Sequence, residues 1–268
     1  MPTPRGSSYN AYLVRGTEKV ALVDTGEPND EAEFITNLMR LDKNSLDYIV
    51  CLHGEQDHSG MLPLLLDVFP MAKVVTNEVC KGLLVEMHNL YELDDRFIIV
   101  GQDDTIDLGG KTLKFYLAPW VHWPDTMFAE VVEDKVLFTS DFLGTHYASE
   151  TLFQNDDLPD YLEAAKRYYA AIMMPFRASV REYLELVKTI DPKIIAPSHG
   201  PVLKMPAKIV DLYADWASET PKNKVVVAYV SMHGSTKQMT NFLVDALIQR
   251  GVPVNQYNLL DTDSCVLG

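Results

Sequence analysis

Residues 46–60 read LDYIVCLHGEQDHSG, so that an apolar run leads directly into two histidines and two acids. The run YIV is typical of a buried β-strand, and the polar residues follow where that strand ends. In extended backbone, side chains two positions apart project from the same face, so His53, Glu55 and Asp57 are expected to converge. His58 follows at the entrance of an expected helix. The stretch therefore predicts a strand that presents a cluster of polar side chains from its carboxyl end.

The composition of this cluster indicates a metal site. Carboxylates and imidazoles crowded together repel one another through like charges unless a cation compensates, and a bound metal ion is the most economical cation for that purpose. A polar surface loop with coincidental spacing is the alternative for this stretch taken alone. The metal hypothesis therefore depends on what the rest of the chain supplies.

Three further candidate ligands follow apolar, strand-like runs. FYLAPWVHWPD contains His122, VLFTSDFLG contains Asp141 and IIAPSHGPV contains His199. Each has an ordinary alternative, because a single buried histidine is often a core residue and an aspartate after a strand is often a helix cap. Together with residues 53–58, the three complete a set of ligands for two metal ions.

Strand-like and helix-like runs are interleaved in a way that indicates a layered α/β domain over residues 1–218. Strand-like runs occur in consecutive pairs and also alternate with helices, which favours sheets covered by helices on their outer faces. The strand-like runs are 11–16, 19–24, 47–52, 73–76, 97–100, 112–118, 127–132, 135–140 and 193–198, and the helix-like runs are 30–41, 60–69, 77–89, 158–174 and 177–190.

A second pattern begins after a linker-like stretch at 219–223. VVVAYVS predicts an apolar strand, MHGST a tight polar loop, KQMTNFLVDALIQRG an amphipathic helix and VPVNQYNLLD another strand. These runs predict a βαβ unit. Because typical domains hold about 100–150 residues, we interpret residues 224–268 as the opening of a doubly wound domain. Either the chain is a fragment or the remaining part lies on another polypeptide.

The loop between the first of these strands and the helix has the chemistry of a phosphate site. It offers three hydroxyl groups, Gly234 permits close backbone approach, and the following helix directs unpaired N–H groups into the loop. A nucleoside-triphosphate loop is excluded because GxxxxGK[ST] is absent, whereas a plain turn remains the alternative. The candidate binding residues are Ser231, Met232, His233, Gly234, Ser235 and Thr236.

Composition restricts the classes of function. The chain has 268 residues, is 47% hydrophobic and carries a formal net charge of −15, which opposes binding to nucleic acid or an anionic membrane. No apolar run approaches the roughly 20 residues of a membrane span, and the first residues lack the features of a signal peptide, so we expect a soluble, cytoplasmic protein. Cys51, Cys80 and Cys265 are too few and too scattered for a disulfide framework or a CxxC metal site.

The order HxExDH, then His, Asp and His, resembles the metallo-β-lactamase superfamily, and glutamate in place of the usual second histidine is similar to the flavodiiron proteins. The match spans nearly all of residues 7–205, including SSYNAYLV and ALVDTG. The resemblance implies an αββα sandwich with two iron ions, followed by a flavodoxin-like part that binds FMN at the loop described above. In the implied centre, His53, Glu55 and His122 hold one iron, Asp57, His58 and His199 hold the other, and Asp141 bridges them.

The same resemblance implies reduction of O2 to water or of NO to N2O with electrons arriving through FMN. It further implies a head-to-tail homodimer or a homotetramer and a rubredoxin-like protein or flavin reductase as electron donor. His146 and Tyr147 are candidates for lining a gas pocket, with a structural role as the alternative. The chain departs from the family pattern at both ends, since family members have further strands ahead of TPRGSSYNAYL and further flavin-binding loops beyond SCVLG.

Two other functions remain open on the sequence. A zinc hydrolase on the same fold would use a metal-bound hydroxide, although Glu55 and the candidate phosphate loop argue against that interpretation. Carboxylates are harder ligands than imidazoles and suit iron, whereas zinc sites lean towards nitrogen and sulfur. A non-catalytic diiron gas sensor or an inactive remnant is the second alternative, motivated by the short flavodoxin-like part.

Overall fold

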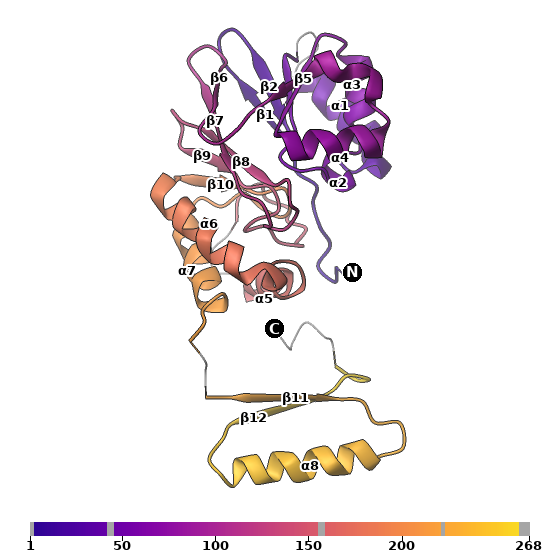
Figure 1. Cartoon of the computed structure of the whole chain (residues 1–268), viewed down its shortest axis with the longest axis vertical. Coiled ribbons are helices and arrows are strands. Elements are labelled where there is room, and N and C mark those ends of the chain that lie inside the picture. The colour runs from indigo at the N-terminus through magenta and orange to yellow at the C-terminus, as the bar shows by residue number, and fades with distance from the viewer. Residues whose placement is uncertain (1–2, 42–45, 155–158, 221–222, 263–268) are drawn as a thin grey trace.

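The structure is a computed structural model that describes residues 3–41, 46–154, 159–220 and 223–262. Within these ranges, the chain up to Trp216 forms four layers, in which helices cover the outer faces of two sheets that pack on each other (Figure 1). The αββα sandwich expected from the sequence is therefore confirmed.

The first sheet contains, in spatial order, β1 (Tyr12–Arg15), β2 (Val20–Val23), β3 (Tyr48–Val50), β4 (Lys73–Thr76) and β5 (Phe97–Ile99). β2 to β5 are parallel, and β1 is antiparallel to β2. All four residues of β2, VALV, are buried, as is typical of a parallel strand whose two faces are both covered.

The second sheet contains, in spatial order, β10 (Ile194–Ala196), β9 (Val136–Phe138), β8 (Met127–Val131), β7 (Thr112–Leu117) and β6 (Thr105–Asp107). Its strands are antiparallel except for the parallel pair β9 and β10. Because β3, β9 and β10 all end at residues that precede candidate ligands, the arrangement of these strands determines which ligands meet.

Helices in the described part of the chain cover the two sheets, and their apolar faces form the outer cores. On α6 (Arg177–Ile190), Val180, Leu184 and Val187 recur at helical spacing and are buried against the second sheet. α1 (Glu31–Leu41), α3 (Leu62–Val68) and α4 (Glu78–His88) pack on the first sheet, and α5 (Pro159–Tyr168), α6 and α7 (Pro206–Trp216) pack on the second.

The central core lies between the sheets. Val23 and Val50 of the first sheet are buried against Phe115 and Phe138 of the second. A core shared by both sheets holds their strand ends in fixed relation, because closely packed interiors leave little room for sliding.

Among the elements that were not predicted from the sequence are β6, α7 and the short helix α2 (Gln56–Ser59). β6 reads TID, with one half-buried and two exposed residues, so it lacks the alternation that marks a strand. α7 begins with Pro206 at its first turn and buries Ile209, Val210 and Tyr213. α7 lies within residues 1–218, the predicted extent of the first domain.

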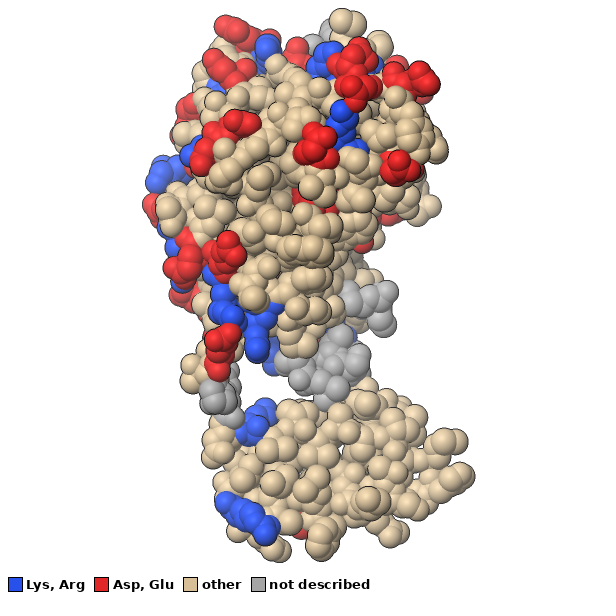
Figure 2. Space-filling view, viewed as in Figure 1, with Lys and Arg blue, Asp and Glu red and all other residues tan. Residues whose placement is uncertain are grey.

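The C-terminal part forms the predicted βαβ unit. β11 (Val225–Tyr229) and β12 (Val254–Asn258) pair in parallel, and α8 (Ser235–Ile248) connects them (Figure 1). Figure 2 shows few charged side chains on the visible face of this unit, in contrast to the many acidic residues on the upper part of the molecule. Met239 and Phe242 of α8 are largely exposed, so part of its apolar face has no packing partner among the described residues.

Some sequence predictions lie outside the described residues. They concern Cys265, positions 221 and 222 of the expected linker, and position 158 of an expected helix. Within the described part of the chain, no helix is both long enough and apolar enough to cross a bilayer.

Candidate metal centre

The seven candidate ligands meet at one end of the sandwich, beyond the carboxyl ends of several strands. His53 follows β3, Asp141 follows β9, His199 follows β10, and His122 lies in the connection between β7 and β8. Their side chains form two groups that could each hold a metal ion, the first with His53, Glu55, His122 and Asp141 and the second with Asp57, His58 and His199.

The first group is centred on the contacts of His122. His122 Nε2 lies 2.9 Å from Asp141 Oδ2 and 3.2 Å from Glu55 Oε2. His53 Nε2 lies 3.6 Å from Glu55 Oε2 and 3.7 Å from Asp141 Oδ2. Four potential donor atoms therefore surround one position.

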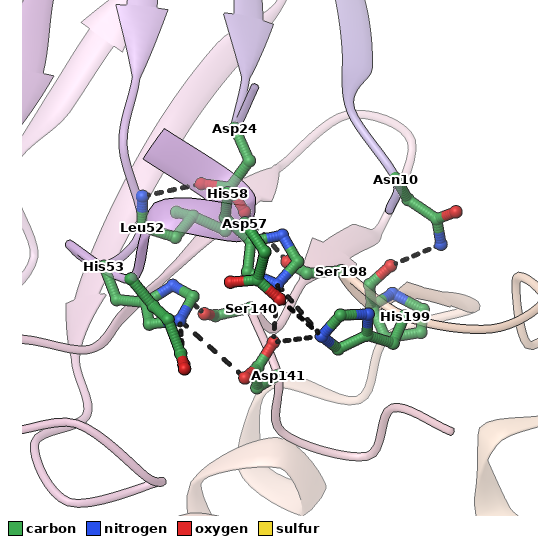
Figure 3. A network of polar contacts seen from close by, with 12 residues as sticks. Asn10, Asp24, Leu52, His53, Asp57, His58, Ser140, Asp141, Ser198 and His199 are labelled. Atoms are coloured by element: carbon green, nitrogen blue, oxygen red, sulfur yellow. Dashed lines mark hydrogen bonds and ion pairs between the residues drawn. The ribbon is translucent and has the colours of Figure 1, made fainter. Parts of the chain in front are cut away.

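In the second group, too, donor atoms from several side chains surround one position. Asp57 Oδ2 lies 3.3 Å from His58 Nε2 and 3.4 Å from His199 Nε2, and the two imidazole nitrogens are 3.0 Å apart. Asp141 Oδ1 lies 3.2 Å from His58 Nε2 and 3.5 Å from His199 Nε2. Asp141 thus directs Oδ2 to the first group and Oδ1 to the second, and Figure 3 shows its carboxylate between His53 and His199.

These distances fit shared coordination of metal ions. Two donor atoms that each lie about 2.1 Å from one ion are about 3.0 Å apart at an octahedral angle and about 3.4 Å apart at a tetrahedral angle. The close pair of nitrogens in His58 and His199 also fits, because both nitrogens can direct lone pairs at one cation.

Unpaired buried atoms support the same interpretation. Among the described residues, His53 Nε2, Asp57 Oδ1 and Asp141 Oδ1 are buried without a hydrogen-bond partner. A buried polar atom without a partner costs free energy. Coordination of metal ions would satisfy these atoms, so the residues present fit a two-metal centre.

Electrostatic coupling is strong within the metal-free cluster. Burial lowers the pKa of His53, but the Asp141 and Glu55 carboxylates more than offset this and raise it to about 9. The pKa of His122 also rises to about 9, because hydrogen bonds to Asp141 and Glu55 outweigh its burial. Burial raises the pKa of Asp141, yet the surrounding histidines, His199 first, hold it well below its usual range. The cluster therefore combines cationic imidazoles with anionic carboxylates when no metal is bound.

Comparison with known proteins identifies the family. A family model described as "ODP family beta lactamase" matches residues 8–200. Flavo-diiron protein FprA2 of Clostridium acetobutylicum is 37% identical over 92% of this chain and 63% of its own length, and the nitric oxide reductase of Moorella thermoacetica is 36% identical over 97% and 66%. The solved rubredoxin oxygen:oxidoreductase of Desulfovibrio gigas matches with a TM-score of 0.89 at 29% identity, covering 98% of this chain and 67% of that one. The chain belongs to the flavodiiron protein family.

The flavodiiron chain spans about two thirds of the length of these relatives. Its match to the family model covers the strands and loops that carry all seven candidate ligands, since the last of them, His199, lies within the matched range.

One part of the sequence-based geometry for this flavodiiron chain is wrong. Extended backbone was expected to bring Asp57 to the same side as His53 and Glu55. Instead, Gln56–Ser59 form the short helix α2, with Glu55 at its N-cap position. The helix turns Asp57 and His58 away from the first pair, so that they join His199 in the second group.

Several residues that were not predicted from the sequence contact the Nδ1 atoms of two of the ligand histidines, whose Nε2 atoms face the cluster in this flavodiiron chain. Ser140 Oγ lies 3.0 Å from His53 Nδ1, and His199 Nδ1 lies 2.8 Å from the Ser8 carbonyl oxygen. Such contacts fix the orientation of a ligating imidazole. The available signal was position, because Ser140 directly precedes Asp141 in the sequence.

Asp24, in the quoted run ALVDTG, is a further supporting residue. It is buried, accepts hydrogen bonds from the Leu52 N–H at 2.8 Å and from the Ser198 hydroxyl at 2.9 Å, and so links the ends of β2, β3 and β10 (Figure 3). Burial, the largest effect, raises the pKa of Asp24.

The two gas-pocket candidates have different surroundings. The ring centroid of His146 lies 5.0 Å from that of His199 and 4.9 Å from that of Tyr168. Burial first, and then the neighbouring His199, lower the pKa of His146 to about 4, so its ring is neutral. Tyr147 packs on Tyr161 in the outer core, which favours a structural role for Tyr147.

The proposed phosphate loop of this flavodiiron chain lies between β11 and α8. Gly234 occupies the N-cap position of α8 with φ of 87° and no side-chain cap. The Ser231 hydroxyl oxygen accepts hydrogen bonds from the N–H groups of Gly234 and Lys237. Space around Gly234 is open, since a Cβ there would meet no atom within 4 Å. An open loop at a helix N-terminus whose N-cap residue has no side chain fits a phosphate group.

Proposed function

We propose that this chain binds two iron ions and FMN and that the protein reduces O2 to water, NO to N2O, or both, with electrons delivered through FMN. The single observation that carries the proposal is Asp141, whose two oxygens face two separate groups of histidine and carboxylate ligands. The names of the Moorella thermoacetica and Desulfovibrio gigas relatives support the two gaseous substrates.

The ligand set favours iron over zinc. Three of the seven side chains are carboxylates, and mixed histidine and carboxylate shells suit iron that binds a diatomic gas. When bound, the iron pair would supply redox electrons and adjacent coordination positions. His53, Glu55 and His122 would hold one ion and Asp57, His58 and His199 the other, with Asp141 shared.

The protein's own side chains would position the ions and control water and protons around them. His53, His58 and Asp141 are fully or almost fully buried, so bulk water has little access to the centre from behind. Tyr9 lies at its edge, with its ring centroid 5.3 Å from that of His199. Burial first, and then Asp57, raise the pKa of Tyr9, so its hydroxyl keeps its proton at neutral pH.

The remaining assignments form part of the same proposal. Residues 1–218 would be the diiron domain, 219–223 a linker and 224–268 part of a flavodoxin-like domain. We further propose a head-to-tail homodimer or homotetramer in the cytoplasm, with a rubredoxin-like protein or a flavin reductase as electron donor. The name of the Desulfovibrio gigas relative supports a rubredoxin donor.

The function is tested by measuring iron and flavin in anaerobically purified protein and then recording O2 and NO consumption with a reductant and redox partner. We expect two iron atoms per chain and rapid gas consumption once FMN is bound. Two zinc atoms and no iron would favour the hydrolase instead. Gas binding without turnover would favour a sensor or an inactive remnant.

His122→Ala and His199→Ala are each expected to lower iron content while the fold is retained. Each substitution removes one ligand, whereas the strands that precede it stay packed in cores that do not depend on the imidazole. Iron per chain is measured by elemental analysis, and folding is measured by circular dichroism. Unchanged iron content in both variants would count against the ligand assignment.

Gly234→Val is expected to weaken FMN binding in protein that carries the rest of the flavodoxin-like domain. The φ of 87° at Gly234 is strained for a β-branched residue, and a side chain would fill the space where a phosphate approaches the backbone. The ratio of flavin to protein measures the effect. Gly251→Val is a matched control, because Gly251 also has a positive φ, of 73°, and open space around it but lies beyond the opposite end of α8. An unchanged flavin ratio in Gly234→Val would make the loop merely structural.

A further inference from the structure

We propose that Asp125 is a positioning residue for the first metal position, because it fixes the backbone of Gly54 between His53 and Glu55. The inference rests on the proposed function, since it assumes that these two side chains and His122 share an ion. Asp125 is not itself a ligand, and it supports the ion at this first position and not the ion at the second.

The position of Glu55 depends on its backbone. His53 is completely buried, but the Glu55 side chain is 35% exposed and its ion-pair contacts are with members of the cluster itself. Packing therefore does little to place this carboxylate. The Glu55 carboxylate is therefore placed by the backbone conformation of Gly54, which lies between the two ligands.

Buried groups hold both the N–H of Gly54, in the His53–Gly54 peptide, and its carbonyl oxygen, in the Gly54–Glu55 peptide. The Gly54 N–H donates to Asp125 Oδ2 at 2.7 Å, and the Ser59 hydroxyl donates to the Gly54 carbonyl oxygen at 2.8 Å. Asp125 is 2% exposed and Ser59 is fully buried. The two bonds together restrain Gly54, and the one to Asp125 comes from the same loop that carries His122.

His88, which is not a candidate ligand, holds Ser59 in place. Ser59 Oγ lies 2.9 Å from His88 Nε2. Because the single hydroxyl hydrogen of Ser59 goes to Gly54, Ser59 must accept from His88 Nε2–H. This contact connects α4, which ends at His88, to residues 53–59, which carry four of the candidate ligands.

Asp125 also connects the turn to the third ligand of the same ion. It lies three residues after His122 in the connection from β7 to β8, and its carbonyl oxygen accepts a hydrogen bond from Asn77 Nδ2 at 2.6 Å. Two residues further on, the Met127 N–H donates to the Leu52 carbonyl oxygen at 2.9 Å. Residues 125–127 therefore run beside residues 52–54 and hold His53, Glu55 and His122, three of the four side chains of the first group, in register.

The second metal position has a different support. The His58 carbonyl oxygen accepts from both the N–H and the hydroxyl of Thr25, and His199 is oriented by the Ser8 carbonyl. These contacts do not involve Asp125. Loss of the Asp125 carboxylate should therefore affect the two ions unequally.

The test compares Asp125→Ala and Asp125→Asn in the full chain, with Fe(II) titrated anaerobically against a chromophoric chelator. We expect Asp125→Ala to weaken one of the two irons about 10–100-fold, the usual effect of losing a supporting partner, and to leave the other unchanged. Mössbauer spectra of isotopically enriched iron should show only one of two signals altered. Asp125→Asn should restore most of the affinity, because its amide oxygen can accept the same Gly54 N–H.

A control and a second variant make the test specific. Asp107→Ala removes a carboxylate that likewise accepts a hydrogen bond from a glycine N–H, that of Gly109 at 2.8 Å, but has no contact with the ligands, and it should leave both iron affinities unchanged. Gly54→Ala places a Cβ 3.1 Å from Met87 Cε, 3.2 Å from Leu83 Cβ and 3.3 Å from Asp125 Oδ2. It should displace the same backbone and weaken the same iron, which tests the idea even if Asp125→Ala does not fold.

The outcomes separate this inference from the proposed function. Equal affinities in the wild type, Asp125→Ala and Gly54→Ala would overturn the positioning role alone, as would an equal loss at both metal positions. Two bound irons without gas reduction in the wild type would overturn the function and leave the positioning role intact. No iron binding by the wild type would overturn both.

Discussion

Asp141→Ala is expected to remove both iron ions and to abolish gas reduction, the largest effect of any single substitution in this chain. Asp141 directs one carboxylate oxygen to each group of candidate ligands, Oδ2 to the first and Oδ1 to the second. Its loss takes a donor from each ion, so we expect iron binding to weaken by more than about 100-fold, the upper end of what losing a mere supporting contact costs. Iron per chain and O2 or NO consumption measure the result.

The matched control is Asp67→Ala, which removes an exposed carboxylate from α3 and should leave iron content unchanged. Circular dichroism is needed beside the iron assay, because Asp141 also balances the charge of the surrounding histidines. Removing one partner of a buried charged group costs up to about 3–5 kcal/mol, although deprotonation of the histidines reduces that cost. Two irons in a folded Asp141→Ala variant would contradict a bridging role.

Iron binding is expected to stabilise the fold by about 4 kcal/mol for each site when free Fe(II) exceeds its dissociation constant about a thousandfold. The ligands come from positions between 53 and 199 and meet only in the folded state, so the unfolded chain offers no comparable site. The ions also give partners to buried atoms that have none in their absence. Anaerobic chemical denaturation with and without Fe(II) measures the difference.

Asp141→Ala serves as the negative control for this second prediction, since it should gain little from added iron. Mg²⁺ at the same concentration tests for a general effect of a divalent cation. The prediction would be wrong if the wild type unfolded at the same denaturant concentration with and without Fe(II).

Local patterns in the sequence were enough for most of the secondary structure. Runs such as KVALVD and KVVT became the buried strands β2 and β4, because a strand covered on both faces must be continuously apolar. The expected helix at 177–190 became α6 with the same bounds, since its apolar residues recur at a period that only a helix satisfies. β6 was missed because a short, mostly exposed strand owes its existence to pairing with β7, which sequence periodicity cannot reveal.

The types of candidate ligand were also evident from the sequence, but their grouping was not evident from periodicity. Alternation in an extended chain placed Asp57 with His53, whereas α2 turns it towards His199. The family resemblance gave the grouping that the structure displays. Asp125 was not predicted from the sequence, because an aspartate after proline in a loop has no periodic or motif signal that distinguishes it from a surface residue.

The sequence by itself determined that this chain forms strands ending in histidines and carboxylates, because hydrophobic period and residue chemistry are local properties. Only the tertiary structure decided that Asp141 lies between two groups and that Asp125 holds the backbone of Gly54 between His53 and Glu55. The physical reason is that these contacts join residues on different strands and loops. Their distances are set by how the two sheets pack and by the register of their strands, which no single stretch of sequence encodes.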